Sequence, residues 1–173
     1  MTILNTYENL LKGKLKRFPK GTWSSLPEEN KALFKRLIRF AILDYYKWDK
    51  EVFCLKFCLK VIITLKLNTG FCKTYNRNIF PMIEECFPEF HIQPWDLTIV
   101  HAPKHYWTRE KAILATKWLI DKELKWDLEK VNNEITNLHF IQHNLGGLLK
   151  CLDVGAKMLV KETYPTYHWN RKE

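Results

Sequence analysis

Apolar residues recur at helical spacing along most of the chain. Between residues 33 and 45 the apolar positions lie three or four residues apart, which places them on one face of a helix. They are Leu33, Phe34, Leu37, Ile38, Ala41, Ile42 and Tyr45. Similar spacing predicts a short N-terminal helix over residues 3–17 and a long helix that ends at Leu124. The pattern therefore predicts a mostly α protein.

The plan of the chain occurs twice. A Pro-Lys-x-x-Trp turn, an apolar helix and a Lys-Trp-Asp end span residues 19–49 and again residues 103–127. Such self-similarity predicts two tandem helical pseudo-repeats of about four helices each. We expect an N-terminal helix or arm over residues 1–17, a basic first repeat over 18–101 and a second repeat over 102–173.

Short polar residues mark where helices begin. Ser24 or Ser25 is a candidate cap before Pro27, which suits the first turn of a helix. Asp49, Thr108 and Asp127 are the corresponding candidates for later helices, because each precedes an apolar periodic stretch.

Connections are predicted at three places. We expect the chain to bend before Leu67-Asn68-Thr69-Gly70, whose Asn and Gly mark a turn, and to bend near Gly146-Gly147 within residues 138–149. Residues 90–101 are expected to be extended, either as a brief strand or as a packed loop.

Composition restricts the class of protein. The 173 residues are 46% apolar, which is enough to bury a core. Lysines interrupt the most apolar stretch, residues 52–67, so no membrane span is predicted. The N-terminus lacks the order of a signal peptide, and the five cysteines show no disulfide spacing. We expect a cytoplasmic protein with reduced cysteines.

The net charge of +9 is unevenly distributed. Residues 52–83 contain five cations and no acid, whereas residues 129–160 balance three lysines against three acids. A second basic cluster, residues 12–20, precedes the first repeat. This distribution favours a polyanionic partner for the first repeat.

Several motifs together resemble a known family. They are Pro-Lys-x-x-Trp, Lys-Trp-Asp, Pro-Trp-Asp-Leu (94–97), Leu-Gly-Gly-Leu-Leu (145–149) and Tyr164-Pro165. The pattern resembles an uncharacterised tryptophan-punctuated helical repeat family of Bacillus and its phages, in which the unit recurs along longer proteins. The first copy departs from it at residues 66–70. The resemblance implies a helical repeat and carries no activity that can be transferred.

Tryptophans at matching places have two interpretations. Aromatic side chains stack on the bases of single strands, but a residue type that recurs in both copies more simply packs the same corner twice. We favour packing for the set Trp23, Trp48, Trp95, Trp107 and Trp126.

The sequence gives little support for a catalytic site or a metal site. Cys54 with Cys58 and His139 with His143 each place two ligand types one helical turn apart, but the two pairs occupy different places in the two copies. Cys72, Cys86 and Cys151 have no local signature of a nucleophile, and no glycine-rich phosphate loop is present. We expect a protein that is not an enzyme and has no cofactor or metal.

The remaining candidate is a helix-turn-helix arrangement over residues 59–87, with residues 73–78 at the start of its second helix. The opposing interpretation is a packed helical hairpin with a solvated basic turn. On the DNA interpretation, cations contact phosphates, and Asn76, Arg77 and Asn78 contact base edges. The phosphate set is Lys14, Lys16, Arg17, Lys56, Lys60, Lys66, Lys73 and Arg77.

Two partners therefore stay open. The first is DNA, bound in a helix-turn-helix-like manner by a non-catalytic regulator. The alternative is a host protein, bound and modulated through the aromatic surface by a small protein encoded by a phage or mobile element. The second repeat would serve for homodimerisation or partner contact.

Overall fold

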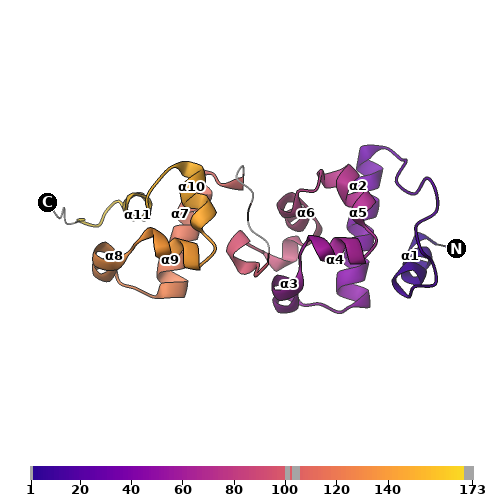
Figure 1. Ribbon diagram of the computed structural model, residues 1–173, viewed down its shortest axis with the longest axis horizontal. Coiled ribbons are helices and arrows are strands. Elements are labelled where there is room, and N and C mark those ends of the chain that lie inside the picture. Colours follow the sequence, from indigo (N-terminus) through magenta and orange to yellow (C-terminus); the bar gives the residue numbers. More distant parts are fainter. Residues whose placement is uncertain (1, 100–101, 103–105, 170–173) are drawn as a thin grey trace. The chain divides into compact units, whose positions relative to one another are not determined.

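The computed structural model describes residues 2–99, 102 and 106–169. Within these residues it contains eleven α-helices, several short 3-10 or π-helical stretches and no strand (Figure 1). The predicted mostly α fold is confirmed. The described part of residues 90–101 contains the 3-10 turn η3 (Pro94–Asp96) and no strand. Of the two predictions for this segment, a brief strand or a packed loop, the structure agrees with the packed loop.

The chain divides into two compact units, residues 1–100 and 101–173, which are described separately. The first contains α1 (Ile3–Leu11), α2 (Pro27–Arg39), the π-helical η1 (Phe40–Tyr45), α3 (Lys50–Lys56), α4 (Leu59–Thr64), α5 (Asn68–Tyr75), α6 (Ile79–Cys86) and the 3-10 turn η2 (Pro88–Phe90). The second contains α7 (Arg109–Lys117), the π-helical η5 (Trp118–Leu124), α8 (Leu128–Glu134), α9 (Asn137–Gln142), α10 (Gly146–Leu152) and α11 (Ala156–Thr163). The matching turn at Pro103-Lys104-His105 lies outside the described residues.

From α2 to α6 the first unit has the same order of helices as the second unit from α7 to α11. α3, α4 and α5 begin at residues 50, 59 and 68, and α8, α9 and α10 begin at residues 128, 137 and 146, a constant separation of 78. The left-handed residues Lys47 and Lys66 have counterparts at the same separation in Lys125 and Asn144. That the two units are repeats of one structure stays a prediction.

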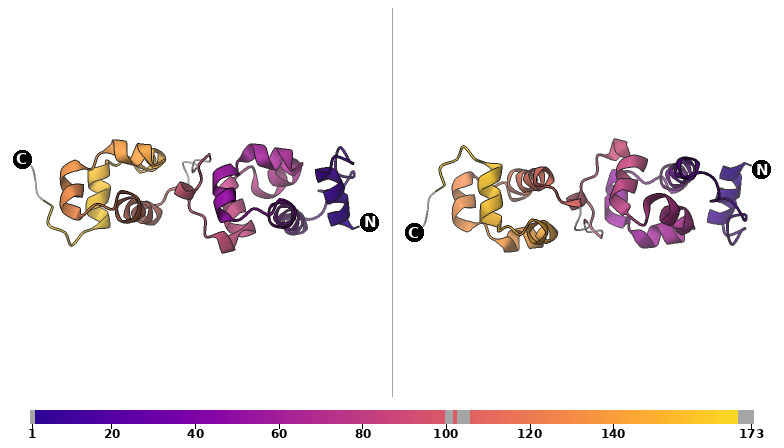
Figure 2. Two further views of the ribbon diagram at one scale, coloured as in Figure 1. Left: turned by 90° about the horizontal axis from the view of Figure 1, so that it is seen from below. Right: turned by 90° about the horizontal axis from the view of Figure 1, so that it is seen from above.

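The core of the first unit forms around α2 and η1. Phe34, Leu37, Ile38, Ala41 and Ile42 are fully buried, as the apolar spacing predicts. Helix α5 packs against α2, as Figures 1 and 2 show. Phe71 of α5 stacks on Phe34 with 6.1 Å between the ring centroids. This packing fixes the position of α5 and of the turn before it.

The Lys-Trp-Asp motif ends one helix and starts the next. Lys47 takes a left-handed conformation with φ 55°, and the Trp48 N–H donates to the Ile42 carbonyl at 2.9 Å. Asp49 then accepts from the Val52 N–H at 2.8 Å and caps α3. In the second unit Lys125 has φ 53° and Asp127 caps α8 at the same distance of 2.8 Å. The predicted caps Asp49 and Asp127 are confirmed, and so is Thr108 on α7.

Two local predictions are wrong. No serine side chain caps α2: the residue before it is Leu26, and Pro27 with two following glutamates forms its first turn. The chain bends before the run from Leu67 to Gly70 as predicted, over residues 65–67, but Asn68 and Gly70 do not form the turn, because α5 begins at Asn68. In the second unit the predicted bend near Gly146-Gly147 is confirmed, because α9 ends at Gln142 and α10 begins at Gly146. Among the described residues no helix is long and apolar enough to span a membrane.

Candidate nucleic-acid interface

A basic loop follows α1 in the first unit. Five of the nine residues from Lys12 to Lys20 are cations, and all five are exposed. Gly13 and Gly21 have φ values of 73° and 89°, a region that favours glycine, so they allow the chain to turn at both ends of the loop. The loop then leads into Trp23, which is only 7% exposed. Buried Trp23 thus anchors an otherwise solvated basic segment.

The turn between α4 and α5 lies close to this loop. Three residues form it, and Lys66 at its centre has a left-handed conformation with φ 61°. The buried Leu65 and Leu67 on either side hold the turn to the core, which leaves Lys66 exposed. The Tyr7 hydroxyl of α1 donates to the Leu65 carbonyl at 3.1 Å. Helix α1 is therefore tied to the turn that carries Lys66.

The basic loop and the α4–α5 turn enclose a cavity of about 560 Å³, which we name the cationic groove. Its charged lining consists of Lys16, Arg17, Lys66 and Lys73, and no acid lines it. Four cations around one cavity produce a positive potential that attracts an anionic ligand. Phe18 and Trp23 add aromatic surface to the same lining.

The four cations have different surroundings. The Lys73 Nζ donates to the Trp23 carbonyl at 2.8 Å, which fastens the basic loop to α5. Lys16, Arg17 and Lys66 are exposed, and within the described part of the chain they form no ion pair. Lys73 thus positions the groove, whereas the other three cations are available to a ligand.

The first turn of α5 also lines the groove, through Asn68 and Thr69. No side chain caps this helix. The N-terminal end of a helix carries a partial positive charge and backbone N–H donors, both of which favour an anion. The helix end therefore adds to the effect of the cations.

The structure brings together four of the predicted contact residues, Lys16, Arg17, Lys66 and Lys73. Lys14 lies on the same loop outside the lining. The remaining predicted residues lie elsewhere: Lys56 and Lys60 line a different pocket, and Asn76, Arg77 and Asn78 connect α5 to α6. The Arg77 Nε donates to the Cys72 Sγ at 3.1 Å.

The prediction that residues 73–78 lead into a reading helix is wrong for residues 73–75, which belong to α5, whereas residues 76–78 directly precede α6. Lys73 and Tyr75 belong to the last turn of α5, and α6 begins only at Ile79. The outer face of α6 carries the exposed Glu84, which would repel phosphates. Helix α5 is thus the better candidate, because its exposed residues Thr69 and Lys73 lie one helical turn apart and the exposed Asn76 follows directly after the helix.

Tryptophans and cysteines have mainly structural surroundings. Trp107 is 6% exposed, and Trp48, Trp95 and Trp126 are half-buried, which agrees with packing. A break between α3 and α4 separates Cys54 from Cys58, so they do not share a helix. In the described residues no three His, Cys, Asp or Glu side chains gather as metal ligands. The His139 Nδ1 instead accepts from the Thr136 N–H at 3.1 Å.

Sequence reasoning missed Asn68 and Thr69 as groove residues. Their composition, next to Gly70, is typical of a turn, and the close contact of Trp23 with Gly70 cannot be seen in the sequence. A signal was present, since a glycine inside a helical pattern often has a packing reason.

Fold and groove together define an all-helical protein whose first unit presents a cationic groove beside a short helical hairpin. The chain belongs to the family described as "Protein of unknown function (DUF4046)", which matches residues 3–92. All residues of the cationic groove lie inside the matched stretch. No curated protein and no solved structure matches the chain.

Proposed function

We propose that the protein binds DNA through its first unit, with the cationic groove on the phosphate backbone and α5 toward the bases. The observation that carries the proposal is the convergence of Lys16, Arg17, Lys66 and Lys73 on one acid-free cavity. The proposal keeps the sequence-based expectations of a non-catalytic regulator in the cytoplasm.

The hairpin of α4 and α5 supports this proposal. Its three-residue turn has the length typical of helix-turn-helix DNA readers, whose second helix enters the major groove. Thr69 on the exposed face of α5 and Asn76 directly after the helix carry groups that bond phosphates and base edges. Lys16, Arg17 and Lys66 would then contact the backbone beside that helix.

The test is a mobility shift of duplex DNA over a range of salt concentrations. Replacing Arg17 and Lys66 together by Ala removes two cations that form no internal ion pair, so the fold should be unaffected. If each contacts one phosphate, the slope of log affinity against log salt falls by about two units. Lys73 is left intact because it holds Trp23.

A matched control removes the same charge from the second unit. Lys150 and Lys157 are exposed, so the Lys150→Ala, Lys157→Ala variant has the same net charge as the groove variant. The control should bind DNA like the wild type. Equal loss of DNA affinity in both variants would indicate a general charge effect. If the wild type binds DNA no more tightly than the Kd of about 10⁻⁴ M expected of weak non-specific binding, the DNA proposal is wrong.

The alternative is a small protein, encoded by a phage or mobile element, that binds a host protein. One observation favours it: an apolar pocket beside Trp48, separate in its lining from the cationic groove. A pull-down from host lysate with and without nuclease separates the two proposals, since only a DNA-mediated capture is lost after nuclease treatment.

A further inference from the structure

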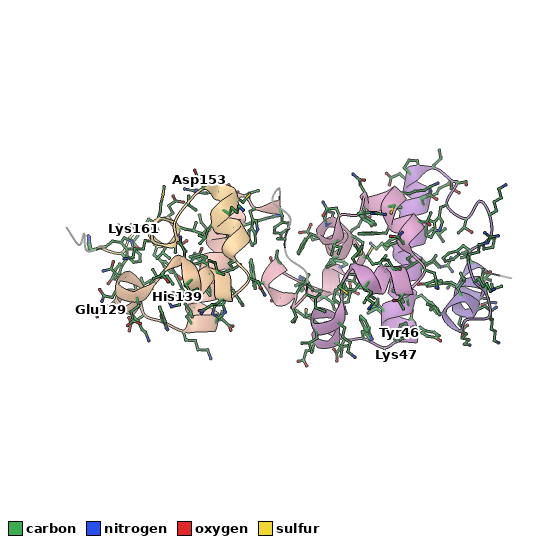
Figure 3. All side chains as sticks on the ribbon, in the orientation of Figure 1. Tyr46, Lys47, Glu129, His139, Asp153 and Lys161 are labelled. Atoms are coloured by element: carbon green, nitrogen blue, oxygen red, sulfur yellow. The ribbon has the colours of Figure 1, made fainter. Side chains whose placement is uncertain are left out.

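A second cavity of the first unit lies between the end of η1 and α4. It has a volume of about 370 Å³. Ile42 and Leu65, which are 0% and 2% exposed, form its apolar base. Trp48 and Val61 line its sides, and Tyr46, labelled in Figure 3, stands at its edge with 43% of its surface exposed. We name this cavity the Trp48 pocket.

The charged lining of the Trp48 pocket is entirely basic. Lys56 and Lys60 are its charged residues, and both are exposed. The Lys56 Nζ lies 6.0 Å from the centroid of the Trp48 ring. Neither lysine forms an ion pair with another described residue. A ligand that enters this pocket therefore meets an apolar base with two free cations beside it.

In the second unit a histidine side chain, His139, packs against the tryptophan that corresponds to Trp48. Val61 is the third residue of α4, and His139 is the third residue of α9. The His139 ring packs edge-on against Trp126 with 5.0 Å between the centroids. Val61 has no ring to place against Trp48. In the first unit the ring that contacts Trp48 is that of Tyr46, with 6.2 Å between the centroids, and the place that corresponds to the His139 ring carries only the Val61 side chain.

The chemistry of the pocket favours a peptide over a small metabolite. Metabolite sites usually direct several fixed polar groups at the ligand. Here the Thr64 hydroxyl already donates to the Lys60 carbonyl at 3.0 Å, and the cations stand on flexible side chains. An apolar anchor with charged neighbours is the pattern by which short protein segments are recognised.

We propose that the Trp48 pocket binds an acidic segment of a partner protein that inserts one aromatic side chain. The ring takes the place that His139 occupies beside Trp126 in the second unit. Carboxylates on either side of the anchor pair with Lys56 and Lys60. This site goes beyond DNA binding and does not depend on it.

The probe is a fluorescein-labelled nonapeptide with a central phenylalanine flanked by glutamates, measured by fluorescence anisotropy with the full chain. Binding should shift the indole N–H resonance of Trp48, assigned by comparison with Trp48→Phe. Peptides with alanine in place of phenylalanine, or with lysines in place of the glutamates, should bind at least about tenfold more weakly.

Val61→His copies the second unit into the first and should weaken the peptide at least about tenfold by filling the pocket. Because this variant alters a half-buried position, a second variant avoids the core: Lys56→Glu with Lys60→Glu changes two exposed residues only. It should abolish binding of the acidic peptide and leave the folded spectrum unchanged.

The groove variant Arg17→Ala with Lys66→Ala should bind the peptide like the wild type. If the groove variant loses peptide binding and Val61→His keeps it, the peptide binds in the cationic groove, and the proposal is wrong. An unshifted Trp48 resonance at saturating peptide would also overturn it. DNA binding is measured separately, so either proposal can fail alone.

Discussion

The indole ring of Trp23 lies directly on Gly70. A Cβ atom at residue 70 would be only 2.5 Å from the Cη2 of Trp23, a distance that real Cβ contacts do not reach. Phe18 packs edge-on against the same indole, with 5.7 Å between the ring centroids. The absent side chain of Gly70 therefore allows the basic loop to dock on α5.

Replacing Gly70 by Ala should destabilise the protein. The added methyl group displaces Trp23 from its position between Phe18 and Phe34, and such overpacking costs about 1–3 kcal/mol. Urea unfolding followed by tryptophan fluorescence measures the change. Thr69→Ala, an exposed substitution in the same helical turn, is the control and should stay within about 0.5 kcal/mol of the wild type. Unchanged stability in Gly70→Ala would show that Trp23 does not pack there.

Replacing Lys73 by Met should loosen the basic loop. The substitution keeps an aliphatic side chain and removes the hydrogen bond from the Lys73 Nζ to the Trp23 carbonyl. Amides of residues 12–22 should exchange with solvent faster, because local opening becomes less costly. Hydrogen exchange read by mass spectrometry measures this effect, and Lys150→Met serves as the charge-matched control. Equal exchange in both variants would contradict a fastening role for Lys73.

Replacing Lys47 by Gly should stabilise the first unit. Lys47 has φ 55°, and a left-handed conformation costs an ordinary residue about 1 kcal/mol relative to glycine. Thermal unfolding should show a rise in Tm. Lys125→Gly should do the same in the second unit, where φ is 53°. Lys50→Gly, inside α3, should lower Tm instead, and a fall for Lys47→Gly would contradict the left-handed assignment.

Stability should fall in alkaline solution because of Cys86. Burial raises the pKa of its thiol from the ordinary 9.0 to about 11. Above pH 9 the unfolded chain loses a proton that the folded chain keeps, so the free energy of unfolding decreases as pH rises toward 11. The buried Tyr75 hydroxyl lies 3.5 Å from the Cys86 Sγ, and burial raises its pKa as well.

Urea unfolding at a series of pH values measures this slope. Cys86→Ala should have a smaller decrease between pH 9 and 11, since one of the two linked groups is gone. The control is Cys151→Ala, which removes a half-exposed thiol of the second unit and leaves Cys86 and Tyr75 in place. Identical slopes in all three proteins would show that Cys86 loses its proton as easily in the folded chain as in the unfolded one.

Local rules were sufficient for the helical skeleton. The apolar spacing identified the buried face of α2, and the capping aspartates Asp49 and Asp127 were predictable because each cap involves residues only three apart. The start of α2 was not predictable in the same way, because the residue before it, Leu26, provides no side-chain cap. Pro27 and the two glutamates that follow it are enough to begin this helix.

The cationic groove could not be predicted from the sequence, because it is formed by contacts between residues that are far apart in the chain. Lys16 and Lys66 are 50 residues apart, and they meet only because Tyr7 and Trp23 bring the N-terminal segment to the α4–α5 turn. The charge pattern identified both groups of cations separately. It could not show that Lys56 and Lys60, in the same acid-free window, face the Trp48 pocket instead.

The hydrogen bond from the Tyr7 hydroxyl to the Leu65 carbonyl couples the docking of helix α1 to the position of the α4–α5 turn, which forms one wall of the groove. The phenol is fully buried, burial raises its pKa, and the carbonyl that it reaches immediately precedes Lys66. Undocking of α1 and loss of the groove wall are therefore one coupled equilibrium. By thermodynamic linkage, an anion held in the groove stabilises the docked state of α1. Conversely, if the groove binds an anion as proposed, sequence changes on α1 would alter that affinity, although no residue of the helix lines the groove.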